Sequence, residues 1–301
     1  MMNQNPLKTK DANCNLKILH RVLPMAQSFP SQYQVHCCYT RCSEEDSYAF
    51  FWPYYLITHD YVIMISADGT SAYLQKDKGI VGRYQEEFHQ LFDKSDVLLE
   101  QYQDDERIIR EYLHNYDKYG MPEYILRSNP GLVHMISYGQ LEERIKNKFQ
   151  KSPAVMEMLS QYYAAWQERK TTPIEFFSQK GLENLIEMDN TASECCPIFL
   201  ELDKEIRNQM IQRLLKEIRE GMESHLIPEN KIRLPQNLML EIFGSNKVVL
   251  FNSTQSSRLN FIQIEEPGIC EAFLDFVEYL IETEVVLSTE ETTEYIEQMI
   301  L

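Results

Sequence analysis

Long hydrophobic runs are absent from this sequence. None reaches the roughly 18 to 20 residues that a helix needs to cross a bilayer. The N-terminal stretch MMNQNPLKTKDANCNLK also lacks the apolar region of a secretory signal. The sequence therefore predicts a soluble protein in the cytoplasm, without a membrane partner.

Basic residues are scarce. The 301 residues include 29 Lys and Arg against 46 Asp and Glu, for a net charge of −17. Phosphate backbones are bound mainly through Lys and Arg, and no basic cluster of the kind found in recognition helices or RNA-binding patches is present. The sequence therefore predicts that this chain makes no direct contact with nucleic acid.

The common signatures of catalysis are also missing. The chain has no G-x-S-x-G, no glycine-rich phosphate loop and no H-E-x-x-H. We therefore predict no catalytic residue and no cofactor.

The seven cysteines are odd in number and include two adjacent pairs, which is typical of reduced thiols rather than of a disulfide framework. The stretch HCCYTRC, residues 36 to 42, suggests zinc because His and Cys are usual zinc ligands. Alternation along a strand would direct Cys37 away from His36 and Cys38, which leaves at most three ligands. Buried reduced thiols are the preferred interpretation, and we predict no metal site.

The composition is that of a globular protein, with 44% hydrophobic and 25% charged residues, and the length suits one large domain or two modules of about 150 residues. In the first part of the chain, apolar spacing predicts a helix over 15–27, strands over 32–40, 54–58, 61–66 and 71–75, and a helix through Tyr84 and Phe92. In the middle it predicts a long helix from Leu98 to Tyr116, strands over 131–137 and at TPIEFFS, and a helix at QKGLENLIEM. The last part is predicted to contain a helix over 204–221 and strands at LMLEIF, KVVLF and NFIQI. These elements predict a mixed α/β fold.

One arrangement occurs twice. When residue 76 is aligned with residue 265, KDKGIV matches EEPGIC, Gly79 meets Gly268 and Leu91 meets Leu280. A three-stranded meander precedes this helix in both places. Either the chain contains a duplication, or a common β-meander-plus-helix motif occurs twice. A duplication predicts two modules about a pseudo-twofold axis, with a ligand cleft between them.

Each copy resembles the C-terminal part of a phospholipase D-like module, most specifically at EEPGICEAFLDFVEYL. The resemblance implies that each half supplies a His and a Lys in an H-x-K-x4-D signature. None of the seven histidines has Lys two positions later, and Pro53 and Tyr55 fall at the His and Lys positions if Asp60 is the Asp. The turn Gly244-Ser245-Asn246 has no carboxylate either. We therefore expect no phosphodiesterase activity.

The whole chain, especially PIEFFSQKGLENLIE, LPQNLMLEIFG and EEPGICEAFLDFVEYLIE, also resembles the C-terminal sensor region of a group of bacterial transcriptional regulators. In those proteins a helix-turn-helix domain usually precedes this region, and no such domain fits before the first meander here. The chain is then either part of a longer regulator or a protein without its own DNA reader. The resemblance implies an unidentified small-molecule partner, and a homodimer is a further expectation.

Five residues are candidate ligand contacts. Tyr54, Tyr55 and His59 could line a cleft, since aromatic rings with polar tips suit ligand walls; alternatively they pack in a core strand followed by an ordinary turn. Asn237 and Glu241 belong to the matching strand of the second copy. A buried polar group needs a partner, which a polar ligand could supply. Alternatively, Asn237 and Glu241 simply face solvent.

The sequence thus predicts two degenerate phospholipase D-like modules, residues 1–130 and 131–301, with a helical segment between them. The preferred function is a non-catalytic, ligand-sensing effector domain of a bacterial transcriptional regulator. The alternatives are a protein–protein adaptor and an enzyme of unrelated mechanism that uses the cleft between the modules. Fold-level analogy carries much of this ranking.

Overall fold

The structure is a computed structural model that describes residues 14–29, 33–37, 54–102, 104–131, 133–145, 150–169, 171–187, 203–235, 237–253 and 259–300. It confirms the mixed α/β class. Two compact units divide the chain: Met1–Leu19 with Gln34–Leu98, and His20–Tyr33 with Leu99–Leu301. These units are defined by contact, whereas the modules 1–130 and 131–301 are defined by duplication and remain a prediction.

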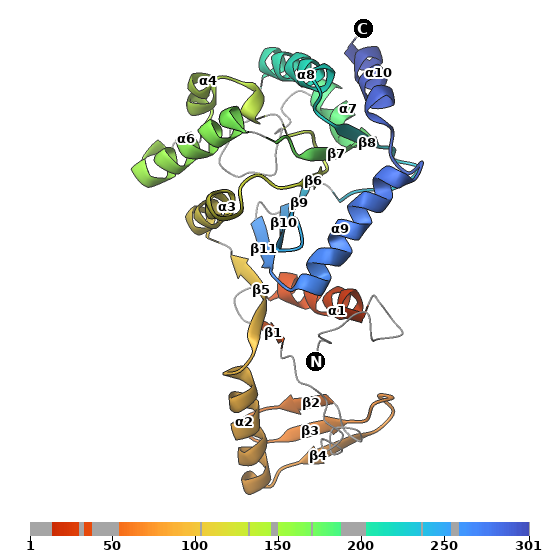
Figure 1. Cartoon of the computed structure of the whole chain (residues 1–301). Helices are drawn as coiled ribbons and strands as arrows, with labels where there is room; N and C mark the ends of the chain where they lie inside the picture. The colour runs from red at the N-terminus through yellow and green to blue at the C-terminus, as the bar shows by residue number, and fades with distance from the viewer. Residues whose placement is uncertain are drawn as a thin grey trace. The chain divides into compact units, whose positions relative to one another are not determined.

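The smaller unit contains the first meander (Figure 1). Strands β2 (Tyr54–Ile57), β3 (Val62–Ile65) and β4 (Ala72–Gln75) form a three-stranded antiparallel sheet, followed by α2 (Lys78–Phe92). The strands lie where the apolar alternation predicted them. The Asp68-Gly69 turn joins β3 to β4, and Gly69 has φ +69°, a conformation that glycine adopts without strain.

The larger unit contains most of an eight-stranded mixed sheet in the order β1-β5-β11-β10-β9-β6-β7-β8. Its strands are β1 (Val35–Cys37), β5 (Asp96–Tyr102), β6 (Tyr124–Arg127), β7 (Ile174–Ser178), β8 (Ser224–Ile227), β9 (Leu238–Phe243), β10 (Lys247–Ser253) and β11 (Leu259–Ile264). Strands β6, β7 and β8 are parallel, and β9, β10 and β11 form the second antiparallel meander. Strand β6 joins the two parts by antiparallel pairing with β9.

Helices flank this sheet (Figure 1). The remaining elements are α1 (Cys14–Ser28), α3 (Asp105–Tyr119), the 3-10 turn η3 (Val133–Met135), α4 (Tyr138–Glu143), α6 (Pro153–Glu168), α7 (Gln179–Glu187), α8 (Lys204–Arg219), α9 (Pro267–Glu282) and α10 (Thr289–Ile300). Helix α9 packs on β9 and β10. Rings from α3 and α6 pack on side chains of β9, β10 and β11 from the opposite face.

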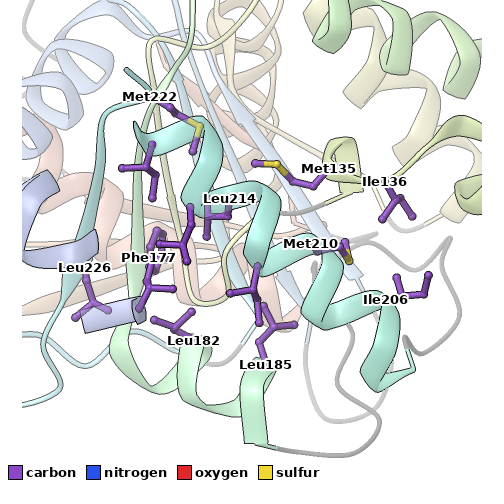
Figure 2. Packing of buried hydrophobic residues seen from close by; sticks show 14 of the residues in the cluster. Met135, Ile136, Phe177, Leu182, Leu185, Ile206, Met210, Leu214, Met222 and Leu226 are labelled. Carbon is purple, nitrogen blue, oxygen red and sulfur yellow. The ribbon is translucent and has the colours of Figure 1, made fainter. Parts of the chain in front are cut away.

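The amphipathic helix α8 supplies much of the larger unit's core. Met210 and Leu214 are fully buried and belong to one cluster with Phe177 of β7 and Leu182 of α7 (Figure 2). Burying a leucine or phenylalanine side chain contributes about 1.5–3 kcal/mol each. The helix faces the core because its apolar residues recur at intervals of three and four.

Two predicted elements are wrong. The helix predicted from Leu98 begins only at Asp105, because Asp96–Tyr102 forms β5 and pairs with β11. Asp104 then caps α3 by accepting a hydrogen bond from the N–H of Arg107. The strand predicted over 131–137 contains the 3-10 turn η3 instead. In both places the tertiary partner, rather than the local spacing, decides the conformation.

Candidate functional site

The five candidate residues divide between the two units. Tyr54, Tyr55 and His59 belong to the smaller unit, whereas Asn237 and Glu241 belong to the larger one. Their convergence on one cleft between modules therefore stays a prediction.

Tyr55 faces the helix of its own unit. Its ring lies 5.3 Å from the ring of Tyr84 in α2, and burial, followed by the neighbouring Tyr84, raises its pKa. His59 is 96% exposed and places Nδ1 3.0 Å from Oδ1 of Asp60. This geometry is that of an exposed turn in which both side chains face solvent.

Asn237 immediately precedes β9 and has φ +57°, in the left-handed region that asparagine tolerates better than most residues. It therefore turns the chain into β9. Glu241, by contrast, lies in the middle of that strand and is only 1% exposed. The alternative in which Glu241 faces solvent is excluded.

The carboxylate of Glu241 is held by two tyrosines of α3. Tyr112 and Tyr116 donate hydrogen bonds from their hydroxyls to Oε1, over 2.8 and 2.7 Å. Burial and then the nearby Glu241 raise the pKa of Tyr116 well above its usual value, which keeps the phenol protonated as a donor. The ring of Tyr162 in α6 packs on both tyrosines.

Glu241 is one member of a polar row that crosses the sheet. Ile125 of β6 is paired with Glu241 on one side and with Glu175 of β7 on the other, and Glu175 is paired with Ser224 of β8. Residues paired in this way share a face. Glu175 is fully buried and accepts a 2.8 Å hydrogen bond from Nη2 of Arg127.

Sequence reasoning missed Glu175 and Arg127. The available signal was one carboxylate inside each of two apolar strands, IEFFS and LMLEIF, because a charge buried in a strand needs a partner elsewhere in the fold. The register that places these carboxylates on the same face could not be read from local spacing.

A second group of charges lies where η3, α6 and α8 meet. His134 stacks on Trp166 with ring centroids 4.0 Å apart, and burial, with Arg127 as the next cause, lowers the pKa of His134 well below its usual value. Glu217 of α8 reaches toward this stack: its Oε2 lies 3.9 Å from Nε2 of His134 and 2.7 Å from Nη2 of Arg169. The neutral His134 is a packing group rather than a cation.

An open hollow of about 860 Å³ follows the outer face of α8. The side chains that line it are Glu205, Asn208, Gln209, Gln212, Arg213, Lys216, Glu217 and Glu220. Three carboxylates, two cations and three amides can donate and accept hydrogen bonds, so the hollow suits a polar ligand. All eight side chains come from the solvent-facing side of α8 and its C-terminal end, so the hollow is an open surface rather than an enclosed cavity.

The next features concern metal-binding clusters and cysteine thiols in the described part of the chain. No group of three or more His, Cys, Asp or Glu residues there could hold a metal ion. Cys37 and Cys270 are buried and form no disulfide. Burial raises the pKa of Cys270 to about 12, far from that of a reactive thiolate. Cys38, Cys42, Cys195 and Cys196 lie outside the described residues.

Comparisons with known proteins include a distant structural neighbour. No protein-family model matches the chain, and no curated protein matches it. TrmBL2, an archaeal chromatin protein whose structure shows a novel mode of DNA binding, is 11% identical, with 74% of this chain and 76% of TrmBL2 covered and a TM-score of 0.29. A similarity this weak carries no argument about function. No helix in the described ranges is long and apolar enough to cross a membrane.

Proposed function

We propose that this chain is a non-catalytic effector domain of a transcriptional regulator, and that a small polar molecule binding along α8 is its signal. The likeness of PIEFFSQKGLENLIE and LPQNLMLEIFG to bacterial sensor regions supports the regulatory part of the proposal. The position of Glu217 carries the ligand-binding part.

Glu217 connects the hollow to the interior. It lines the hollow and forms ion pairs with Arg169, over 2.7 Å, and with Arg213, over 3.4 Å. Arg169 in turn lies over the ring of Trp166, which stacks on His134. A ligand that competes for Arg213 or Glu217 therefore changes contacts between α8 and the end of α6.

Such a ligand has a physical route to a signal. A ligand shifts a conformational equilibrium only by its differential affinity for two states. Glu217 is shared between Arg169 and Arg213, and a polar group that binds along α8 replaces one of these partners. In the polar row Glu175 is paired with Arg127, and Glu241 accepts hydrogen bonds from the hydroxyls of Tyr112 and Tyr116, which favours a structural role for these carboxylates over acid–base chemistry.

The proposal is tested by a thermal-shift screen of the full chain against metabolites, nucleotides and divalent metals, because a ligand of the native state raises the melting temperature by mass action. Binding of the best probe is then measured by calorimetry for Gln212→Ala, in the hollow, and for Gln298→Ala, an exposed glutamine on α10. We expect Gln212→Ala to weaken binding about tenfold, the size of one lost hydrogen bond, and Gln298→Ala to leave it unchanged. The absence of any shift, or equal binding by both variants, would overturn the proposal.

A protein–protein adaptor is the second candidate. One observation favours it: the sheet of the smaller unit exposes large apolar side chains, with Tyr54 and Leu56 both more than half exposed. Large exposed apolar patches mark protein–protein interaction sites, among other binding surfaces.

A further inference from the structure

Among the residues that the structure describes, no helix covers one face of the three-stranded sheet of the smaller unit. Its strand register places six side chains together on that face: Tyr54, Leu56, Ile63, Ile65, Ala72 and Leu74. Residues of the opposite parity face α2, as shown by the Tyr55–Tyr84 ring contact and the hydrogen bond from Tyr84 Oη to Met64 Sδ. We call the six-residue surface the meander face.

The meander face is apolar and open. Tyr54, Leu56 and Leu74 are 53%, 52% and 48% exposed. Ile63 and Ile65 are partly buried between them, and Ala72 is exposed. In a half-solvated antiparallel sheet the outer face normally carries polar residues in alternation with the buried ones. Here both faces are apolar, and the side toward α2 also has exposed rings, with Tyr55 and Tyr73 43% and 52% exposed. The meander face differs in having no described helix against it.

Charge is absent from the whole sheet. None of the strand residues in YYLI, VIMI and AYLQ carries a charge, although one residue in four of the chain does. Charges lie around the rim, in the turns at Asp60 and Asp68 and at the start of α2, and Glu87 of α2 lies near Tyr55 on the opposite face. An apolar centre with a charged rim is the anatomy of a protein interface. The two edge strands also lack the lysines and prolines that commonly block edge-to-edge pairing.

We propose that the meander face binds the meander face of a second copy of this chain. A face without charge offers nothing with which to select a different partner by electrostatic complementarity, whereas in a twofold dimer the same patch of both copies meets and no second surface is required. The chain carries a net charge of −17, so two copies repel each other wherever their charged surfaces approach. This uncharged face is where they can meet.

The size of the face predicts a weak dimer. Three strands about 4.8 Å apart, each four residues long at about 3.3 Å per residue, give a surface well below the roughly 800 Å² per partner of a stable interface. The two copies are therefore in a reversible monomer–dimer equilibrium. The fraction of dimer rises with the protein concentration. This inference is independent of any ligand at α8.

Analytical ultracentrifugation of the full chain from about 1 to about 300 μM tests it, since dimer formation depends on concentration by mass action. We expect the weight-average mass to rise from 35.6 kDa toward twice that value. Leu56→Glu and Leu74→Glu should remain monomeric over the range. Tyr279→Glu, an equally exposed apolar residue on α9 (58% exposed), is the matched control and should associate as the wild type does.

Folding is checked separately. Leu56→Thr/Leu74→Thr keeps residues that favour strands, and it should weaken association at least tenfold while leaving the circular dichroism spectrum unchanged. A wild-type chain that stays monomeric at the highest concentration overturns the proposal, as does association that survives both Glu substitutions. Flotation of the wild type, but not of Leu56→Glu, with phosphatidylcholine vesicles would assign the face to lipid and also overturn it.

Discussion

The two β-meanders of this protein share a local pattern and differ in burial. In both, three antiparallel strands lead into a helix whose first N–H groups are capped by a carboxylate at the equivalent position: Asp77 before α2 and Glu266 before α9. Each carboxylate accepts a hydrogen bond from the N–H of an isoleucine three residues later, Ile80 or Ile269. The local chemistry of the two segments is the same.

Their surroundings are not the same. In β2 three of the four residues are exposed, whereas in β9 five of the six are buried. Strands β9 to β11 lie inside a larger sheet whose faces are covered by α9 and by rings of α3 and α6. The comparison teaches that a meander and its capped helix form from local sequence, while the role of their side chains depends on what packs against them.

The largest loss of unfolding free energy is expected from substitutions in the polar row, a feature that the first meander lacks. Glu175→Ala removes the carboxylate from a buried ion pair with Arg127, and such a loss costs about 3–5 kcal/mol of unfolding free energy. Urea denaturation monitored by circular dichroism measures it. The control Glu86→Ala, an exposed carboxylate on α2, should change stability by less than about 0.5 kcal/mol.

A double variant sharpens this test. Replacing both Arg127 and Glu175 by methionine should recover most of the loss, because exchanging a buried ion pair for apolar groups is often nearly neutral. A single Glu175→Ala variant as stable as the wild type would show that the ion pair is not coupled to folding.

The direct comparison of the meanders uses one leucine from each. Leu240 of β9 is 4% exposed and Leu56 of β2 is 52% exposed. Leu240→Ala should cost about 2–5 kcal/mol, as buried leucines do, and Leu56→Ala less than about 1 kcal/mol in dilute monomer. Equal losses in urea denaturation at low protein concentration would contradict the difference in burial.

Smaller losses of stability, similar in the two meanders, are expected at the helix N-caps, because both segments have this feature. Asp77→Ala and Glu266→Ala should each cost about 1 kcal/mol, the usual contribution of a helix N-cap. Asp77→Asn retains a side-chain acceptor and should be nearly neutral. Amide hydrogen exchange of Ile80 and Ile269 is the measurement, and faster exchange at only one of them would mean that the two caps are not equivalent.

The smallest effect concerns the exposed turn of the first meander. Hydrogen bonds from the Ser66 hydroxyl and then from the N–H and hydroxyl of Thr70 lower the pKa of Asp68 from 3.8 to about 2. A lowered pKa means that the carboxylate stabilises the turn above pH 3.8 and that this contribution is lost as the pH falls toward 2. An NMR titration of the Asp68 carboxyl should show a midpoint near 2, and a midpoint near 3.8 would contradict these hydrogen bonds.

Particular elements show how far sequence reasoning reached. The strands around Asp68-Gly69 and the amphipathic α8 were predicted correctly because turn chemistry and apolar periodicity are local signals. Strand β5 was predicted as helix because Leu98 and Tyr102 also fit helical spacing, and only pairing with β11 decides for a strand. Glu241 was recognised as a candidate, but its two tyrosine partners lie well over a hundred residues away in sequence.

The sequence by itself determined the mixed α/β class, the two meanders, the capped helices that follow them and the strongly acidic surface, because each depends on neighbours within a few residues or on composition. The tertiary structure decided that one meander is buried in a large sheet and the other stays open. It also brought Glu241 to Tyr112 and Tyr116, and Glu175 to Arg127. Those pairings depend on strand register and on packing between distant segments, which local periodicity does not encode.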